Sequence, residues 1–282
     1  MDIISIAFIF IIGIIIGSFL NVVALRYNTG LSIYNDRSRC PTCNSPLKWY
    51  ELIPLFSYLS LRGKCATCKS PISAQYPVIE FITGLIFVGI YLRQLSLWSI
   101  YGQFQHGMLY SVLFFFYYAI VFSILLVIVV YDIRHKVIPN SFVYAFIALS
   151  VIKLGLFFYI KGYIENADLF DMFSPLILSL PIVIMWYVSG GRWIGFGDAK
   201  LIFGVGALLG FVCGLSALVL AFWIGALYSI ILLAKSKIEG EGHKVSMKSE
   251  IPFAPFIILG AIIVFFSHID VLGIGAMIDL LK

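Results

Sequence analysis

Long uninterrupted runs of apolar residues constrain this chain more than any other feature. They cover residues 3–24, 78–94, 109–131, 140–159, 174–190, 200–213, 214–234 and 252–267. A bilayer core about 30 Å thick needs roughly 20 apolar residues per helix, and backbone groups in lipid must be hydrogen-bonded internally. Because the runs are continuous rather than alternating, they predict helices and not barrel strands. With 61% hydrophobic residues, we expect an all-α polytopic membrane protein with about eight transmembrane helices.

The stretch 199–234 decides how many helices cross the membrane. As a single helix it would be about 50 Å long at 1.5 Å per residue, which is too long for one crossing. Gly204, Gly206, Gly210 and Gly214 offer places to break it. We expect a tight hairpin here and therefore eight spans, with seven as the alternative.

The placement of Lys and Arg predicts the orientation. With eight spans and the N-terminus outside, the inside segments are 25–77, 131–139, 190–200 and 234–251, and they hold fifteen of the nineteen basic residues. Short cytoplasmic segments are rich in Lys and Arg, so these segments are predicted to be cytoplasmic. The same rule explains the net charge of +5, which therefore does not indicate a nucleic-acid partner.

The inside segment 25–77 contains two pairs of cysteines, Cys40 with Cys43 and Cys65 with Cys68, and each pair is followed by Ser-Pro. Four thiolates on two tight turns match the tetrahedral coordination that zinc prefers. Structural disulfides rarely persist in the cytoplasm, so a structural zinc site is favoured over two disulfides or free thiols. The organisation that we expect is residues 1–80, a first span with this zinc-binding loop, followed by a multispan domain in residues 81–282.

Two aspartates lie where an apolar run ends or begins. Asp132 follows the run 109–131, and Asp198 follows Gly195-Phe196-Gly197 at the start of another run. Ionisable groups near lipid are costly and mark functional sites, and the charge count places both aspartates at the cytoplasmic boundary. Two carboxylates that share a proton can serve as general base and general acid for water attack on a peptide bond. This pattern indicates an intramembrane aspartyl protease.

Each aspartate also has a structural interpretation. Asp132 is expected to pair with Arg134 or Lys136 if its role is structural, although a carboxylate at a helix C-terminus opposes the helix dipole. Asp198 is in a position to stabilise a helix start as an N-cap or first-turn acid. A transporter that uses both acids as an ion site is a further alternative, but the acids lie at helix ends and the sequence shows no repeat.

Other residues join these aspartates as candidate site residues. Gly195 and Gly197 let a backbone approach closely, so main-chain hydrogen bonds at this segment are expected to hold an extended substrate. Lys200 and Pro139 are the remaining substrate-binding candidates. Glu80, at the start of the second run, is interpreted as a helix cap or as a residue of the cofactor or substrate site.

The chain resembles the type IV prepilin leader peptidase family over nearly its whole length. The motifs that carry the resemblance are Gly17-Ser18-Phe19-Leu20-Asn21, Arg39-Cys40-Pro41, Trp49-Tyr50-Glu51-Leu52-Ile53-Pro54, Leu61-Arg62-Gly63-Lys64-Cys65, Tyr76-Pro77-Val78-Ile79-Glu80, Ile138-Pro139-Asn140 after Asp132, and Gly195-Phe196-Gly197-Asp198-Ala199-Lys200. Pro252-Phe253-Ala254-Pro255-Phe256 resembles the family's Pro-Phe-Gly-Pro-Phe, with Ala254 in place of the glycine.

The resemblance implies an activity for the chain. Members remove the basic leader from type IV prepilins and pseudopilins after a glycine, at the cytoplasmic face of the bacterial inner membrane. Many members with the cysteine-bearing domain also methylate the new N-terminal residue with S-adenosylmethionine. The resemblance thus implies Asp132 and Asp198 as the catalytic pair, prepilins as substrates and lipid as the surroundings. A peptidase without methyltransferase activity remains the alternative. Trp49 and Tyr50 are expected either to stack on an adenine ring or to seat the loop at the membrane interface.

Overall fold

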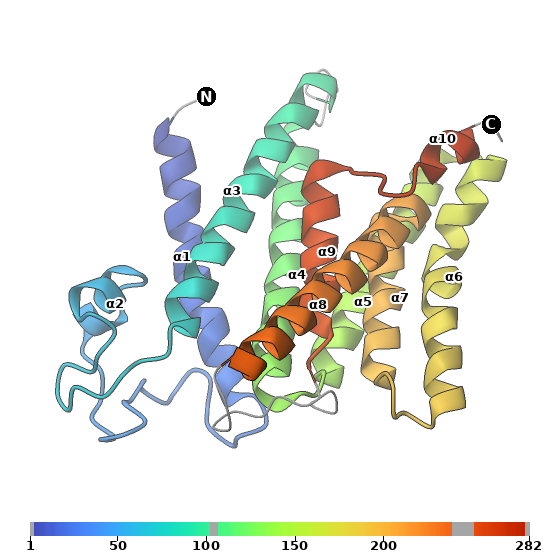
Figure 1. Cartoon of the computed structure of the whole chain (residues 1–282). Helices are drawn as coiled ribbons and strands as arrows, with labels where there is room; N and C mark the ends of the chain where they lie inside the picture. Colours follow the sequence, from blue (N-terminus) through green and yellow to red (C-terminus); the bar gives the residue numbers. More distant parts are fainter. Residues whose placement is uncertain (1–2, 102–106, 239–250, 280–282) are drawn as a thin grey trace. The chain divides into compact units, whose positions relative to one another are not determined.

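The computed structural model describes residues 3–101, 107–238 and 251–279, and in these ranges it contains helices and no strand (Figure 1). The elements are α1 Ile3–Arg26, η1 Trp49–Leu52, α2 Phe56–Ser60, α3 Gln75–Tyr101, α4 Gly107–His135, α5 Asn140–Lys161, α6 Asn166–Ser189, α7 Phe196–Leu209, α8 Phe211–Ile238, α9 Ala254–Ser267 and α10 Ile274–Asp279. Each predicted apolar run forms a helix, so the prediction of an all-α polytopic membrane protein is confirmed.

The number of crossings is less simple than the sequence predicts. Among the described residues, six helices are long and apolar enough to cross a membrane, namely α1, α3, α4, α5, α6 and α8. Helices α7 and α9 have 14 residues each, about 21 Å at 1.5 Å per residue, which is shorter than a bilayer core. The structure therefore supports six membrane spans among the described residues, and crossings by α7 and α9, which would bring the number to eight, stay a prediction.

The chain divides into two compact units, Met1–Val130 and Tyr131–Lys282. The division falls within α4, and the domain boundary that the sequence predicts after residue 80 stays a prediction. In the first unit α1 packs closely on α3. A Cβ atom at Gly13 would lie 2.7 Å from the Cα atom of Gly84, and one at Gly17 would lie 2.8 Å from the Cα atom of Glu80. Small residues four positions apart let these two helices approach backbone to backbone.

In the second unit α7 packs against α5, α6, α8 and α9, and nine of its fourteen residues are buried. Contact is close where α7 lacks side chains. A Cβ atom at Gly204 would clash with the ring of Phe146, and one at Gly206 would lie 2.9 Å from the carbonyl oxygen of Ser174. Helix α7 is therefore surrounded by protein, which explains how a helix too short for the bilayer core is accommodated.

The break predicted in 199–234 is confirmed, but it falls at Gly210, four residues before the predicted start of the next span. Gly210 has φ +81°, a conformation that glycine adopts without strain. Neighbouring helices satisfy the broken backbone. Lys153 of α5 donates a hydrogen bond to the carbonyl oxygen of Leu208 (3.0 Å), and Asp171 of α6 accepts one from the backbone N–H of Phe211 (2.7 Å). A cation thus lies at the C-terminus of α7 and an anion at the N-terminus of α8, as the helix dipoles favour.

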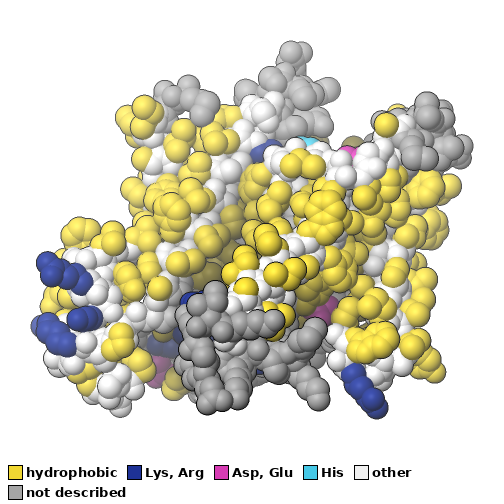
Figure 2. Space-filling view, in the orientation of Figure 1, with side chains coloured by type: hydrophobic (Ala, Val, Ile, Leu, Met, Phe, Trp, Pro, Cys, Tyr) yellow, Lys and Arg dark blue, Asp and Glu magenta, His cyan; other side chains and the backbone are white. Residues whose placement is uncertain are grey.

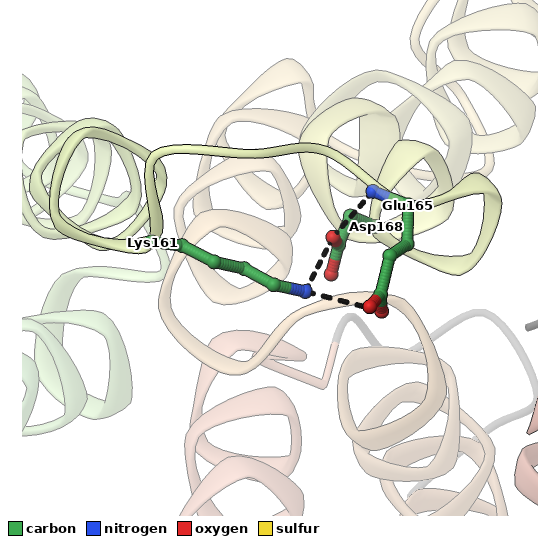
Figure 3. Close-up of polar contacts among 3 residues, drawn as sticks. All are labelled: Lys161, Glu165 and Asp168. Carbon is green, nitrogen blue, oxygen red and sulfur yellow. Dashed lines mark hydrogen bonds and ion pairs between the residues drawn. The ribbon is translucent and has the colours of Figure 1, made fainter.

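An ion cluster ties α5 to α6 at the loop between them (Figure 3). The Nζ atom of Lys161 lies 2.5 Å from Oδ2 of Asp168 and 3.3 Å from Oε2 of Glu165. Oδ2 of Asp168 also accepts a hydrogen bond from the backbone N–H of Glu165 at 2.9 Å. Glu165 and Asp168 therefore hold the start of α6 to the end of α5.

Candidate functional site

Asp132 lies in the last turn of α4 and is 3% exposed, whereas Arg134 and Lys136 are exposed. The backbone N–H of Ala254, the first residue of α9, donates a hydrogen bond to the Asp132 carboxylate. The Oδ2 atom of Asp132 is buried and has no hydrogen-bond partner. Burial of a polar atom without a partner is costly.

Asp198 is the third residue of α7, after the N-cap Gly195. It is 9% exposed, and its carboxylate accepts a hydrogen bond from the backbone N–H of Gly195. A Cβ atom at Gly195 would lie 3.4 Å from Oδ2 of Asp198, so a glycine leaves this face of the carboxylate open. The first-turn position that the structural interpretation expects is therefore present, and the acid is nevertheless buried.

The structure brings the two aspartates together. The Asp132 carboxylate is near enough to act on Asp198 by Coulomb repulsion. One carboxylate is bonded at the N-terminus of α9 and the other at the N-terminus of α7, so the positive ends of two helix dipoles face the pair. Two like-charged carboxylates in a buried site favour sharing one proton between them. The arrangement can supply one general base and one general acid.

The turn between α4 and α5 packs on the start of α7. A Cβ atom at Gly197 would lie 3.0 Å from the Cβ atom of Ile138. Lys200 donates a hydrogen bond to Oδ1 of Asn140 (2.9 Å), and its Nζ atom lies 4.9 Å from the ring centroid of Tyr144. These contacts fix the segment that carries Asp132 against the segment that carries Asp198. Pro139 is buried as the N-cap residue of α5. The substrate-binding roles of Gly195, Gly197, Lys200 and Pro139 stay predictions.

The four cysteines of the first unit converge. The four sulfur atoms of Cys40, Cys43, Cys65 and Cys68 lie within 4.8 Å of one another, and all four thiols are free. The two turns repeat the same geometry. The N–H of Cys40 bonds to Ser45 O (3.0 Å) and the N–H of Cys65 to Ser70 O (2.9 Å). The residue after each second cysteine has positive φ, Asn44 at 57° and Lys69 at 60°.

The cluster fits a tetrahedral zinc ion. Zinc–sulfur bonds of about 2.3 Å place the sulfur atoms about 3.8 Å apart, and Sγ of Cys40 lies 3.8 Å from Sγ of Cys68. Hydrogen bonds from the backbone of Cys43 and the hydroxyl of Ser70 lower the pKa of Cys40 to about 6. A thiolate is the form that binds metal, so the first turn favours the metal-binding form of Cys40. Burial and the neighbouring thiols of Cys40 and Cys68 instead raise the pKa of Cys65.

Glu80 does not cap α3, because the helix begins at Gln75 and Glu80 is its sixth residue. Its carboxylate is buried and accepts a hydrogen bond from the backbone N–H of Leu55 at 2.8 Å. Leu55 has φ +60°, which is uncommon for a residue with a side chain. Glu80 thus holds the cysteine-bearing loop to α3, and its role at a cofactor site stays a prediction.

Three residues of this architecture were not singled out from the sequence. Ala254 was identified only as a departure from a motif. Lys153 and Asp171 were not predicted to be partners of α7 and α8. A lysine within an apolar run was the available signal for Lys153, since such a residue needs a polar partner. Nothing local indicates which partner it finds.

The fold and the site define a multi-pass helical membrane protein with a buried pair of aspartates and a cluster of four cysteines whose geometry fits a metal ion. Residues 11–94 match the model of the bacterial Peptidase A24 N-terminal domain, and residues 119–230 match that of the type IV leader peptidase family. The chain belongs to the type IV leader peptidase family, and the resemblance read from the motifs is confirmed.

Several relatives carry the name prepilin leader peptidase/N-methyltransferase. The protein from Bacillus subtilis is 30% identical over 260 residues, which are 91% of this chain and 92% of that protein. The protein from Xanthomonas campestris is 31% identical over 289 residues, 90% of this chain and 88% of that protein. The protein from Myxococcus xanthus is 33% identical over 230 residues, and the match spans 80% of this chain but 62% of that longer protein. No solved structure gives a significant match.

Proposed function

We propose that this chain is an aspartyl endopeptidase that removes the leader from type IV prepilins or pseudopilins, and that it methylates the new N-terminus. The observation that carries the peptidase proposal is the pair of buried carboxylates at the ends of α4 and α7, each bonded to a backbone N–H at a helix N-terminus. Family membership supplies the substrate class, since the relatives' names contain both activities.

In the proposed reaction Asp132 and Asp198 share one proton. The ionised carboxylate takes a proton from water while the water oxygen bonds to the carbonyl carbon of the scissile peptide, and the protonated carboxyl gives its proton to the carbonyl oxygen. When the tetrahedral species collapses, the carboxyl that took the water proton gives it to the amine nitrogen, the other carboxylate takes a proton from a hydroxyl of the diol, and the C–N bond breaks. The unpartnered Oδ2 of Asp132 is the atom that we assign to the water.

The position of the pair supports a substrate that is basic on one side of the cut and apolar on the other. Both aspartates lie at the end of an apolar helix, beside segments 131–139 and 190–200 that carry Lys and Arg. By the positive-inside rule this end faces the cytoplasm of a bacterial inner membrane. The exposed backbone at Gly195 and the side chain of Lys200 are proposed to hold the extended peptide.

The four-cysteine cluster is proposed to bind structural zinc. Cys40, Cys43, Cys65 and Cys68 would fill the four tetrahedral positions around the ion, so no position would be left open for a substrate. The ion would hold together a loop of about thirty residues that has little core of its own. The methyl donor is proposed to be S-adenosylmethionine, with Glu80 contributing to its site.

Co-expression with a prepilin, followed by mass spectrometry of the pilin N-terminus, tests both activities at once. We expect a pilin that lacks its leader and is heavier by one methyl group. An uncleaved pilin with well-expressed enzyme would overturn the peptidase proposal. A cleaved but unmethylated pilin would reduce the protein to a peptidase.

A further inference from the structure

The segment from Trp49 to Ser60 exposes a row of large apolar side chains in an otherwise polar loop. We call Trp49, Leu52, Ile53, Phe56 and Leu59 the apolar ridge. The exposed fractions are 78% for Trp49, 65% for Phe56 and 73% for Leu59. The opposite side of the segment is fixed to the loop, since Leu55 and Tyr58 are half-buried and Gly63 lies under the Tyr58 ring. Several exposed large apolar side chains so close together in the sequence indicate an interaction surface.

The hydrogen bond to α3 determines where the apolar ridge lies along the axes of the first membrane helices, and therefore how deep it lies in the membrane. Leu55, in the middle of the ridge, donates its backbone N–H to Glu80, and Glu80 also bonds to the hydroxyl of Ser18 on α1. Glu80 lies about 8 Å along α3 from its first residue, and Ser18 lies about 12 Å before the end of α1. The segment therefore folds back toward the apolar parts of α1 and α3, and Figure 1 shows α2 level with these two helices and not beyond their ends.

The surroundings of the apolar ridge are basic. Lys48 precedes it and Arg62 follows it, and both side chains are exposed. The loop 25–77 has seven basic residues and two acids, and Figure 2 shows Lys and Arg side chains beside apolar ones in the region where α2 lies. Apolar and aromatic side chains flanked by cations are typical of segments that bind the interface of anionic bilayers.

We propose that the apolar ridge inserts into the headgroup–acyl boundary of the cytoplasmic leaflet and docks the four-cysteine module on the membrane. The hydrogen bond between Leu55 and Glu80 holds the ridge at that depth, and Lys48 and Arg62 face the lipid phosphates. The loop that carries the four cysteines would then be anchored at the membrane interface beside α1 and α3. This inference does not depend on the proposed reaction.

The test is fluorescence of the full-length protein in vesicles of phosphatidylglycerol and phosphatidylcholine, with bromine at a shallow or a deep position of the acyl chains. The chain has five tryptophans, so the signal of Trp49 is the difference between the wild type and Trp49→Phe. We expect this signal to be quenched at least twofold by shallow bromine and less by deep bromine. A Trp49 signal that acrylamide quenches and lipid bromine does not would overturn the proposal.

Charged substitutions separate insertion from folding. Phe56→Asp and Leu59→Asp are expected to reduce the quenching of Trp49 by shallow bromine more than twofold, while the metal content stays unchanged. The matched control is Leu31→Asp, which changes a leucine of the same loop that is 57% exposed and outside the ridge, and it is expected to leave the quenching as in the wild type. A Trp49 signal shielded from both quenchers would show that protein covers the ridge, either this chain or a bound pilin, and would also overturn the lipid assignment.

Discussion

In Met1–Val130 four cysteines lie on two turns of a loop, whereas in Tyr131–Lys282 two aspartates lie on the ends of packed helices. The cysteines are only 28 residues apart at most, and two of them, Cys43 and Cys68, are exposed. The aspartates are buried, and their partners come from α7 and α9. One site is local in sequence, and the other is assembled by tertiary structure.

The difference teaches what each site needs in order to exist. The loop around the cysteines has little apolar core, so its folding would depend on the proposed metal. The helices around the aspartates are held by their own packing, with α7 largely buried among its neighbours. Removing the ligands should therefore damage structure in the first unit and chemistry in the second.

The largest expected effect is on cleavage. Asp132→Asn and Asp198→Asn should each lower the rate of leader removal by a factor of at least about 100, since general acid–base catalysis contributes roughly 10²–10⁴. Both variants should insert and unfold like the wild type. Glu165→Gln is the matched control in the same unit and should cleave normally. The measurement is the amount of pilin without its leader, identified by intact mass, per unit of folded enzyme. A variant of either aspartate that cleaves as fast as the wild type would contradict the catalytic role of the pair.

The next effect is on the structure of the first unit. Replacing Cys40 or Cys65 with Ser should remove about one zinc per chain and make residues 40–70 sensitive to protease, because four-cysteine sites supply the folding energy of small loops. Leader removal should persist in part, because both aspartates lie in the other unit. Metal analysis and limited proteolysis under reducing conditions check this, and a zinc-free wild type would disprove the site.

A smaller effect tests whether packing alone holds α7. Lys153→Met removes the donor to the Leu208 carbonyl and should lower the free energy of unfolding by about 1–3 kcal/mol, the cost of leaving a buried polar group unpaired. Lys153→Arg, which keeps a cationic donor, should recover most of it. Denaturant unfolding in detergent gives the comparison. Equal stability of the Met variant and the wild type would show that the capped break at Gly210 does not need this lysine.

The smallest effect sharpens the role of α9. Ala254→Gly restores the residue that the family motif carries and keeps the backbone N–H that bonds to Asp132. A glycine in the middle of a helix costs about 0.5–1 kcal/mol, and Ala254 is the first residue of α9. The free energy of unfolding should therefore fall by no more than this, and the cleavage rate should stay within about twofold. A large loss of cleavage would mean that the methyl group of Ala254, and not its N–H, matters to the site.

The same contrast explains how far the sequence could be interpreted. The four cysteines, the apolar helices and the positions of Asp132 and Asp198 at helix ends follow from spacing and composition. The hydrogen bond from Ala254 to Asp132 joins residues 122 positions apart, and that from Lys153 to Leu208 joins residues 55 positions apart. Such partners depend on how helices pack, which no local pattern encodes. The sequence left seven or eight spans open for the same reason. An apolar run that is buried by other helices, as α7 is, has the same composition as one that is buried by lipid.

The central claim is that two carboxylates act together on the peptide bond, and the pH dependence of leader removal by the reconstituted full-length protein tests it most directly. Two coupled acids that share a proton predict a bell-shaped profile of kcat/KM, with two apparent pKa values that belong to the pair. The profile should keep its shape after the zinc is chelated. A rate that rises with pH to a plateau, or a profile whose shape changes when the zinc is removed, would contradict the account.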